Sequence, residues 1–456
     1  MRLETQAQGL DPDGSARWLV RVRFVDEAGQ PTRLIGGGDV EFAATGGDAQ
    51  WQTRTRYGGP AAVIRTTRAG TLAVRATVKN PTGIPDAVAR IDAHASSGPS
   101  IAAGALGPHL VQIGWFPASR GPSTVVRSGL DGTHVVCAPA PPASTCGDRG
   151  VTPGATYRYS VVRAAGRTTS PPLTVPSKLA AQSLDAMRGK GMWLSFSPDG
   201  ADADAFDKLD PRAQVARAKA AGIRYIELRM AYGEFWEVTP AAKAYVDTLI
   251  DAAAAEGIAT LAWTVPRAPT FADLALATAA ARYRTASGTP VAGLALDLER
   301  GDGYFGDGPA AAAAMAAYVR VVREALGPSA LLVATVEDPY LNGLTNRDVP
   351  IAAIAAEASA LQPMVYWRML QRAISESGAR AVIRRSLETV RREAGRTIAV
   401  NVGGQTSGIG PCGAPSAAEI EATLDESRRD GALGETFFDW TGTLDPQWSA
   451  LGAFPW

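Results

Sequence analysis

The sequence predicts a multidomain protein in which two all-β sandwiches precede an α/β barrel of the (β/α)8 type. The chain has 456 residues, more than one domain usually contains. Residues 1–176 consist largely of short alternating apolar runs separated by turn residues, a pattern typical of β-sandwiches. From Gly191 the pattern becomes strand, loop and helix, repeated eight times, which fits a complete barrel.

Residues 1–92 are predicted to form an immunoglobulin-like β-sandwich. Its apolar runs include Trp18–Phe24 and Leu72–Val78, and both are bounded by turn residues. Three segments resemble the bacterial immunoglobulin-like modules of adhesins, and equally the sandwich domains appended to β-galactosidase-type glycoside hydrolases: Asp11–Ser15, Val25–Pro31 and Ala69–Ala76. The resemblance implies a spacer or brace, so no catalytic residue is expected here.

Residues 93–177 are predicted to form a second sandwich. Val111–Trp115 alternates as a strand, and Pro153–Val162 resembles the late strands of a fibronectin type III domain, in which a tyrosine locks a corner. Cys137 and Cys146 lie in one proline-rich loop and could form a disulfide bond, which would suggest an oxidising compartment. Two free thiols are the alternative.

Residues 185–456 are predicted to form the catalytic barrel. Its expected strands are 192–196, 225–229, 259–264, 292–299, 331–335, 364–367, 398–402 and 436–440. Its expected helices are 212–221, 240–256, 271–284, 309–326, 350–361, 377–394 and 416–429, with a short one near Trp448. Gly222 and Gly257 stand where helices need C-terminal caps.

The fourth predicted strand of the barrel ends in two acids. Leu294, Leu296 and Leu298 share one parity, whereas Asp297 and Glu299 share the other, because side chains alternate across a strand. The leucines are therefore expected to face the helices and the acids to face the lumen. Active sites of such barrels lie at the C-terminal strand ends. Asp297 and Glu299 are thus the first candidates for catalysis, and two solvated acids at a strand end are the alternative.

Other predicted strand ends carry carboxylates, tyrosine and tryptophan. The further catalytic candidates are Glu337 and Tyr366. The candidates for substrate binding are Glu227, Arg229, Trp263, Trp367, Asn401, Asp439 and Trp440. Acids cleave glycosidic bonds and aromatic rings stack on sugars, so this set favours carbohydrate chemistry. For each tryptophan, ordinary core packing is the alternative.

Composition excludes several other kinds of function. The formal net charge is 0, with 45 basic and 45 acidic residues, so no basic excess indicates a nucleic-acid partner. No apolar run reaches transmembrane length. All 3 histidines precede residue 135, which removes histidine bases and histidine metal ligands from the barrel. No cofactor and no metal site are predicted, and the acidic segment Asp199–Asp207 is interpreted as a solvated loop rather than a calcium site.

Gly293–Glu299 resembles the end of the fourth-strand motif of chitinase-type (family 18) glycoside hydrolases, and the Asp-x-Glu of lysozyme-type family 25 muramidases. Met364–Tyr366 resembles the Met-x-Tyr of the chitinase type, and Trp440 matches the tryptophan that floors its cleaved-sugar subsite. The resemblance implies that Glu299 is the general acid, that Asp297 orients an acetamido group and that Tyr366 hydrogen-bonds that group. Ala295 and Trp367 replace two aspartates of that family's pattern.

Strand geometry limits how the two acids work together. Residues i and i+2 of a strand lie roughly 6–7 Å apart, more than the ~5–5.5 Å of a retaining carboxylate pair. The nucleophile is therefore expected to come from the substrate, from Glu337 or from Glu227. The charge of Asp297 is expected to raise the pKa of Glu299.

The sequence thus predicts a glycoside hydrolase that acts on a polysaccharide or cell-wall glycan. The alternative is a non-catalytic carbohydrate-binding or adhesion protein on a degenerate barrel. The N-terminus is not a signal peptide, so the chain is either cytosolic or a mature, secreted region without its leader, and we expect the latter. The glycine-rich segment Gly301–Gly308 is either a substrate loop or a plain turn.

Overall fold

The computed structural model describes residues 2–10, 16–23, 39–46, 50–54, 61–66, 70–80, 86–93, 100–116, 121–141, 145–164, 166–195, 210–238, 240–267, 270–301, 304–368, 374–408 and 413–456. Among these residues the chain divides into two compact units, one ending at Lys178 and one running from Leu179 to Trp456. The acidic segment Asp199–Asp207 and Cys412 lie outside the described residues.

The first part of the N-terminal unit contains two antiparallel sheets. One has the order β1 (Arg2–Leu10), β2 (Ala16–Arg23), β5 (Ala61–Thr66) and β4 (Gln50–Arg54). The other has the order β3 (Asp39–Thr45), β6 (Gly70–Asn80) and β7 (Ala87–Ala93). Val20 and Ile64 of the first sheet and Phe42, Val74 and Ile91 of the second belong to one buried cluster. The two sheets therefore share a hydrophobic core.

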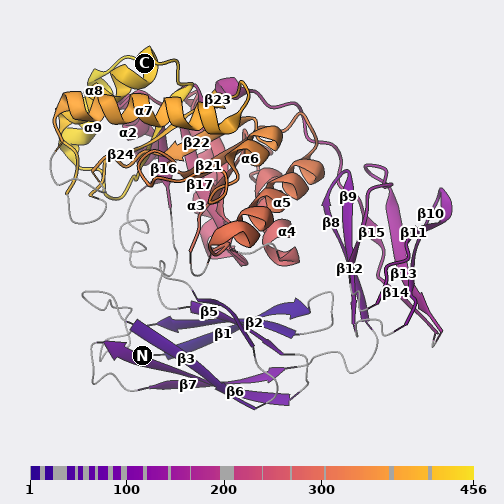
Figure 1. Cartoon of the computed structure of the whole chain (residues 1–456). Helices are drawn as coiled ribbons and strands as arrows, with labels where there is room; N and C mark the ends of the chain where they lie inside the picture. The colour runs from indigo at the N-terminus through magenta and orange to yellow at the C-terminus, as the bar shows by residue number, and fades with distance from the viewer. Residues whose placement is uncertain are drawn as a thin grey trace. The chain divides into compact units, whose positions relative to one another are not determined.

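The second part of this unit, drawn in purple in Figure 1, repeats that arrangement. One sheet has the order β12 (Thr145–Asp148), β9 (Leu110–Phe116) and β8 (Ser100–Gly107). The other has the order β11 (Gly132–Cys137), β10 (Thr124–Gly129), β13 (Thr156–Arg163) and β14 (Gly166–Thr169), with β15 (Leu173–Thr174) beside β13. Trp115 and Tyr159 lie in their common core, and a disulfide bond joins Cys137 of β11 to Cys146 of β12.

Eight parallel strands close into a barrel in the second unit, as the sequence predicts. Around the ring they are β16 (Gly189–Leu194), β17 (Ile223–Tyr232), β19 (Ala259–Val265), β20 (Leu294–Leu298), β21 (Leu332–Glu337), β22 (Ala360–Met364), β24 (Val402–Gln405) and β25 (Gly434–Phe438). β25 pairs with β16 and closes the ring. The two-residue strand β23 (Ala399–Val400) pairs with β22, and β18 (Phe235–Trp236) folds back on β17.

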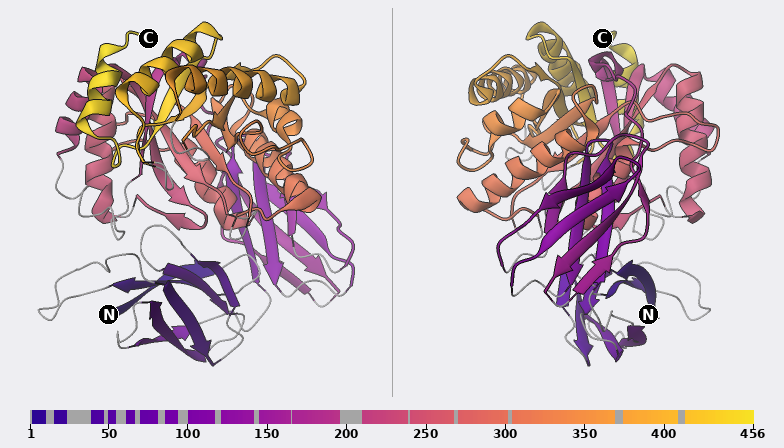
Figure 2. Two further views of the ribbon diagram at one scale, coloured as in Figure 1. Left: turned by 60° about the vertical axis from the view of Figure 1, so that its left-hand side comes forward. Right: turned by 90° about the vertical axis from the view of Figure 1, so that its right-hand side faces the viewer.

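Helices follow the strands around the barrel, and α7 and α8 lie side by side in orange and yellow in Figure 2. They are α2 (Pro211–Ala220), α3 (Pro240–Ala255), α4 (Phe271–Ala281), α5 (Gly308–Leu326), α6 (Ile351–Glu357), α7 (Glu376–Ala394), α8 (Ala417–Arg429) and α9 (Asp445–Ala453). A short 3-10 helix, η1 (Leu184–Met187), precedes the first strand. Gly395 ends α7 in the left-handed conformation, at a φ of 64°.

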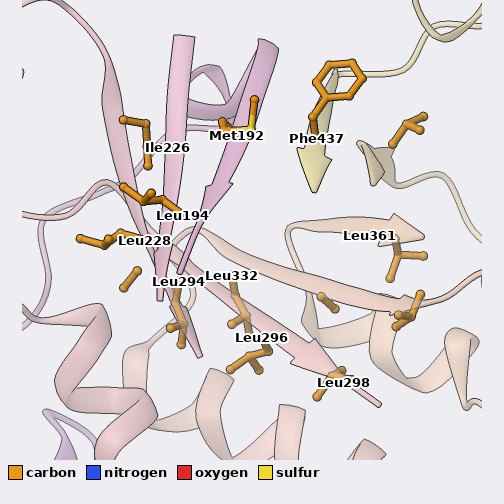
Figure 3. Close-up of a cluster of buried hydrophobic side chains, with 14 of the residues drawn as sticks. Met192, Leu194, Ile226, Leu228, Leu294, Leu296, Leu298, Leu332, Leu361 and Phe437 are labelled. Carbon is orange, nitrogen blue, oxygen red and sulfur yellow. The ribbon is translucent and has the colours of Figure 1, made fainter. Parts of the chain in front are cut away.

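The alternation along β20 places its side chains as the sequence predicts. Leu294, Leu296 and Leu298 belong to the large hydrophobic cluster between the strands and the helices (Figure 3). Ala295 belongs instead to the smaller cluster that fills the lumen, together with Trp193 and Trp263. Asp297 has the parity of Ala295, so its carboxyl group enters the lumen.

The sixth strand differs from the prediction. It runs from Ala360 to Met364, so it begins four residues earlier than the predicted strand 364–367. Tyr366 and Trp367 therefore follow its end. Polar Gln362 and Pro363, which lacks the N–H that a sheet uses, are locally unfavourable for a buried strand. In the barrel the Gln362 amide is fully buried and bonds Thr335 of the neighbouring strand β21 and Glu227 of β17 across the lumen.

Lys190 joins the first strand to the end of the chain. Its side chain is 2% exposed, and Nζ donates to the backbone oxygens of Leu451 and Phe454. Burial lowers the pKa of this amine to about 8. The C-terminal helix α9 is thereby held against the start of the barrel.

Candidate active site

A buried polar layer crosses the lumen and contains two predicted site residues, Glu227 and Asn401. Nε2 of Gln362 lies 2.8 Å from Oε1 of Glu227 and 3.0 Å from Oδ1 of Asn401. Thr436 Oγ1 lies 3.1 Å from the same Glu227 oxygen, and Asn401 Nδ2 donates to the Tyr225 hydroxyl at 2.8 Å. Burial raises the pKa of Glu227 to about 7. The Asn401 amide and one oxygen of Glu227 are therefore engaged inside the barrel, whereas Glu227 Oε2 is buried without a hydrogen-bond partner among the described residues.

Asp297 is almost completely enclosed, with 6% of its surface exposed. Its Oδ2 accepts a hydrogen bond of 3.2 Å from the Trp263 indole. Burial, followed by the charge of Glu299, raises the pKa of Asp297 well above its usual range. The protonated form of Asp297 is therefore favoured.

Glu299 is more accessible, because its residue is only partly buried. Burial raises its pKa, as does the charge of Glu337, whereas a hydrogen bond from Tyr304 and the charge of Arg267 lower it. The burial of Glu299 has the largest effect on its pKa, and the like charges of Asp297 and Glu299 oppose each other's ionisation.

Glu337 lies beside Glu299 on the neighbouring strand. Leu298 of β20 pairs with Val336 of β21, so the two glutamates follow at the same level of two adjacent parallel strands. Adjacent strands are about 4.8 Å apart. Arg300 Nε donates to Oε2 of Glu337, and 26% of the Glu337 side chain is exposed.

Tyr366 lies close to several acids although it stands beyond the end of β22. Burial raises the pKa of its hydroxyl well above the usual range, and the charges of Asp297, Glu299 and Asp439 act in the same direction. Its ring packs against Phe438 at a centroid distance of 5.9 Å. Strand ends from three parts of the barrel thus meet around this hydroxyl.

Asp439 is fixed by the loop that follows β25. Its Oδ2 accepts a hydrogen bond of 2.6 Å from Thr441 Oγ1, and its Oδ1 accepts one of 3.1 Å from the Gly442 amide. Only 9% of Asp439 is exposed. The residue therefore acts on Tyr366 by its charge and has limited contact with solvent.

Arg229 forms a salt bridge with Glu237, which follows the short strand that folds back on β17. Its Nε and Nη2 donate to the two carboxylate oxygens of Glu237, at 2.7 and 2.9 Å. Its guanidinium lies 5.5 Å from the Trp263 ring and 5.4 Å from the Tyr232 ring. Arg229 and Trp263 thus form part of the inner wall beside Asp297.

Trp367 and Trp440 do not line the lumen. Both belong to the hydrophobic cluster between strands and helices, where Trp367 is 1% and Trp440 is 5% exposed. Trp440 packs edge-on against Trp448 at 4.7 Å. The prediction that these two indoles stack on a sugar is therefore wrong for this structure. Strands β22 and β25 end earlier than predicted, so both residues follow the strands and turn outward.

Three residues beside Glu299 were not predicted: Tyr232, Arg267 and Tyr304. Strict alternation along β17 would place Ala231, not Tyr232, on the lumen side with Glu227 and Arg229. The pairing of β17 with β19 shifts between Arg229 and Ala231, and this irregularity turns Tyr232 into the lumen cluster. Tyr304 belongs to the glycine-rich segment Gly301–Gly308, which was the one available signal in the sequence.

Among the described residues, no group of three or more His, Cys, Asp and Glu side chains could hold a metal ion. None of the described helices has the length and apolar character needed to cross a membrane.

Comparison with known proteins gives distant structural likenesses. No family model matches the sequence, and no curated protein matches it significantly. The chain is similar to the spore cortex-lytic enzyme SleL of Bacillus megaterium QM B1551, at 12% identity and a TM-score of 0.42, over 62% of this chain and 77% of that one. It is also similar to a GH18 chitinase from Cycas revoluta in complex with (GlcNAc)3, at 11% identity and a TM-score of 0.41, over 58% and 98% of the two chains.

A third similar structure is a family 39 glycoside hydrolase from Bacteroides cellulosilyticus WH2. It has 14% identity and a TM-score of 0.37, over 73% of this chain and 77% of that one. These likenesses are too distant to carry an argument about the reaction, which has to be argued from the residues of the barrel.

Proposed function

We propose that this protein is a glycoside hydrolase that cleaves a polysaccharide or a cell-wall glycan. One observation carries the proposal: Glu299, partly exposed at the end of β20, lies above the buried Asp297 and level with Glu337 of the next strand. Carboxyl groups at the C-terminal ends of barrel strands, one protonated and one ionised, are what hydrolysis of a glycosidic bond requires.

Glu299 is the proton donor in this proposal. Its burial raises its pKa, so the carboxyl group keeps its proton closer to neutral pH than an exposed glutamate does. The proton passes to the glycosidic oxygen as the bond to the anomeric carbon breaks, and the leaving sugar departs as an alcohol. Asp297 stays neutral beneath Glu299, and the Tyr366 hydroxyl is available to hydrogen-bond the substrate.

Glu337 is the proposed nucleophile. Strand spacing puts the backbones of Glu299 and Glu337 about 4.8 Å apart, so their carboxyl groups can reach the ~5–5.5 Å separation of a retaining pair. Glu227 fits this role less well, because it is fully buried in the polar layer with Gln362 and Thr436. The Arg300 guanidinium balances the charge of Glu337 until substrate binds. A nucleophile supplied by the substrate is the competing arrangement.

The N-terminal unit is proposed to brace or space the barrel. We interpret residues 1–92 as an immunoglobulin-like sandwich and residues 93–177 as a fibronectin type III-like sandwich, since in each case two sheets share one core. The disulfide between Cys137 and Cys146 supports a protein that works outside the cytoplasm.

A second candidate function is carbohydrate binding without hydrolysis. The contacts of Arg229 with Glu237 and of Glu337 with Arg300 favour it, because they occupy charged groups that catalysis needs free. The two candidates differ in what happens to a bound glycan, so one series of measurements separates them.

The test begins with a screen of the purified chain on chitin, peptidoglycan, arabinan, galactan and β-glucan. For the glycan that is cleaved, Glu299→Gln should lower kcat about 10²–10⁴-fold with little change in binding. An activated aryl glycoside needs little protonation of its leaving group and should partly restore the rate. Glu421→Gln, an exposed glutamate of α8, is the matched control and should leave kcat unchanged.

Two results would contradict the proposal. Near-full activity of Glu299→Gln on the natural glycan would show that another group donates the proton. Binding of a glycan without any cleavage would favour the second candidate. The anomeric configuration of the first product, followed by NMR, separates a retaining mechanism from an inverting one.

A further inference from the structure

The loop after β20 returns a tyrosine onto Glu299. The amide of Gly301 donates to the Gly306 oxygen at 3.1 Å, and the amide of Gly306 donates back to the Gly301 oxygen at 3.2 Å. Both glycines have positive φ, 83° and 85°, which other residues rarely adopt. Phe305 packs edge-on against Tyr318 of α5 at 5.6 Å. The loop is therefore anchored on both sides of Tyr304, whose ring joins the lumen cluster.

A chain of hydrogen bonds links this tyrosine to an arginine. Nη1 of Arg267 donates to the Tyr232 hydroxyl at 2.6 Å, and the hydroxyls of Tyr232 and Tyr304 lie 3.2 Å apart. The loop also returns to Glu299: the Phe305 amide lies 3.4 Å from the Glu299 carbonyl oxygen, and a hydrogen bond from the neighbouring Tyr304 lowers the pKa of the Glu299 carboxyl group. The guanidinium of Arg267 lies 5.0 Å from the Tyr232 ring and 4.5 Å from the Tyr304 ring.

Chemistry fixes the direction of the first of these hydrogen bonds, whereas either hydroxyl can donate between Tyr232 and Tyr304. An arginine side chain donates only, so the Tyr232 oxygen accepts from Arg267. The single proton of Tyr232 is then available to the Tyr304 oxygen, and the proton of Tyr304 is available to the Glu299 carboxylate. The positive charge at one end polarises each hydroxyl toward the negative charge at the other.

We propose that Tyr304 is a positioning residue of the active site and that Arg267, Tyr232 and Tyr304 form a one-way chain of donors that fixes the Glu299 carboxyl group. The catalytic meaning of this inference rests on the proposed function, whereas the chain itself does not. The described residues Gly301 and 304–308 then hold Tyr304 against Glu299.

The chain has a measurable consequence for the titration of Glu299. A donor that bonds the ionised carboxylate stabilises that form and lowers the pKa of the acid. Removal of the Tyr304 hydroxyl therefore raises the pKa of Glu299. In Tyr304→Phe the ring that lies against Arg267 is kept, so the change is confined to one hydroxyl.

The first experiment does not depend on activity. The wild-type chain and Tyr304→Phe are labelled with carbon-13 at the glutamate carboxyl groups and titrated by NMR, with Glu299→Gln identifying the Glu299 signal. We expect the Glu299 midpoint to rise by about one pH unit in Tyr304→Phe. Tyr245→Phe, which removes another partly buried hydroxyl that bonds Gln214 on α2, is the control and should leave the midpoint unchanged.

The second experiment uses the glycan found in the screen. In Tyr304→Phe the basic limb of the pH profile of kcat/KM should move upward by the same amount, and kcat should fall about 10-fold with little change in KM. An unchanged Glu299 midpoint in folded Tyr304→Phe would overturn the inference. A shifted midpoint in a chain that cleaves no glycan would leave the inference standing and would reject the proposed function.

Discussion

Within the described residues, the Asp297 carboxyl group accepts a single hydrogen bond, which comes from the indole of Trp263. The indole Nε1 lies 3.2 Å from Oδ2, and the buried Oδ1 has no hydrogen-bond partner in that part of the chain. One neutral donor does not offset the cost of burying a carboxylate, so the protonated form is favoured. In the proposed mechanism, the ionisation that controls the rate therefore belongs to Glu299 rather than to Asp297.

Asp297→Asn tests this assignment. Because a neutral group replaces a neutral group, we expect the basic limb of the kcat/KM profile to stay in place, while kcat falls about 10-fold through loss of the carboxyl proton. The measurement is a pH profile of both proteins on the same glycan. A limb that moves to lower pH would mean that Asp297 is ionised in the working enzyme.

Glu337→Gln is expected to move the same limb in the opposite way to the Tyr304 variant. The charge of Glu337 raises the pKa of Glu299, so its removal lowers that pKa and shifts the limb to lower pH. The shift is measured on residual activity or by carboxyl NMR. Asp307→Asn is the matched control, because Asp307 is a more exposed acid 3.5 Å from the same Arg300; an equal shift in both variants would contradict a specific effect of Glu337.

Glu435 gives a prediction about stability. It is fully buried, Ser427 donates to its Oε2 at 2.7 Å, and burial raises its pKa to about 8. In the unfolded chain the Glu435 carboxyl group ionises near pH 4.5. The folded state therefore loses stability as the pH rises from 4.5 to about 8, and it loses no more above that pH. Glu435→Gln should remove this loss, which for roughly three pKa units is about 4 kcal/mol.

The check is urea unfolding of the barrel, followed by tryptophan fluorescence, at pH 4 and at pH 9. The variant and the wild type should have similar free energies of unfolding at pH 4 and differ at pH 9. Glu421→Gln, an exposed glutamate on α8, should show no difference at either pH. A constant difference between Glu435→Gln and the wild type at both values would rule out ionisation as the cause.

The disulfide bond should stabilise the part of the N-terminal unit that contains it. Cys137 and Cys146 are 9 positions apart, and closing a loop of about ten residues is worth about 2–3 kcal/mol in the unfolded chain. In the double variant Cys137→Ala, Cys146→Ala the free energy of unfolding, measured with urea, should be lower by that amount. Dithiothreitol should destabilise the wild type and leave the variant unchanged; equal sensitivity of both would place the effect elsewhere.

The barrel and one half of the site were predictable because β20 is regular. Period-two alternation places Leu296 outside and Asp297 inside without any knowledge of distant residues. The same rule fails where a strand is irregular. The shift in β17 after Arg229 reverses the parity at Tyr232, and nothing in the local sequence announces it.

The other misses arise from partners that are far away in sequence. Gln362 is a suitable strand residue only because Thr335 of the adjacent strand and Glu227 from across the lumen bond its amide. Trp367 and Trp440 look like rim residues if their strands are drawn a few residues too late, and the strand ends depend on pairing with neighbours rather than on local propensity. Arg267 and Tyr304 come together from two different loops.

Lys190 and Leu451 are 261 positions apart, yet the amine of the first strand is satisfied by backbone oxygens of the last helix. A ribosome releases β16 long before it has made these oxygens, and β25, which covers one edge of β16, is also made late. During synthesis Lys190 and the edge of β16 that later pairs with β25 therefore remain exposed until these partners have been made. The barrel can therefore close only after β25 and α9 have been synthesised.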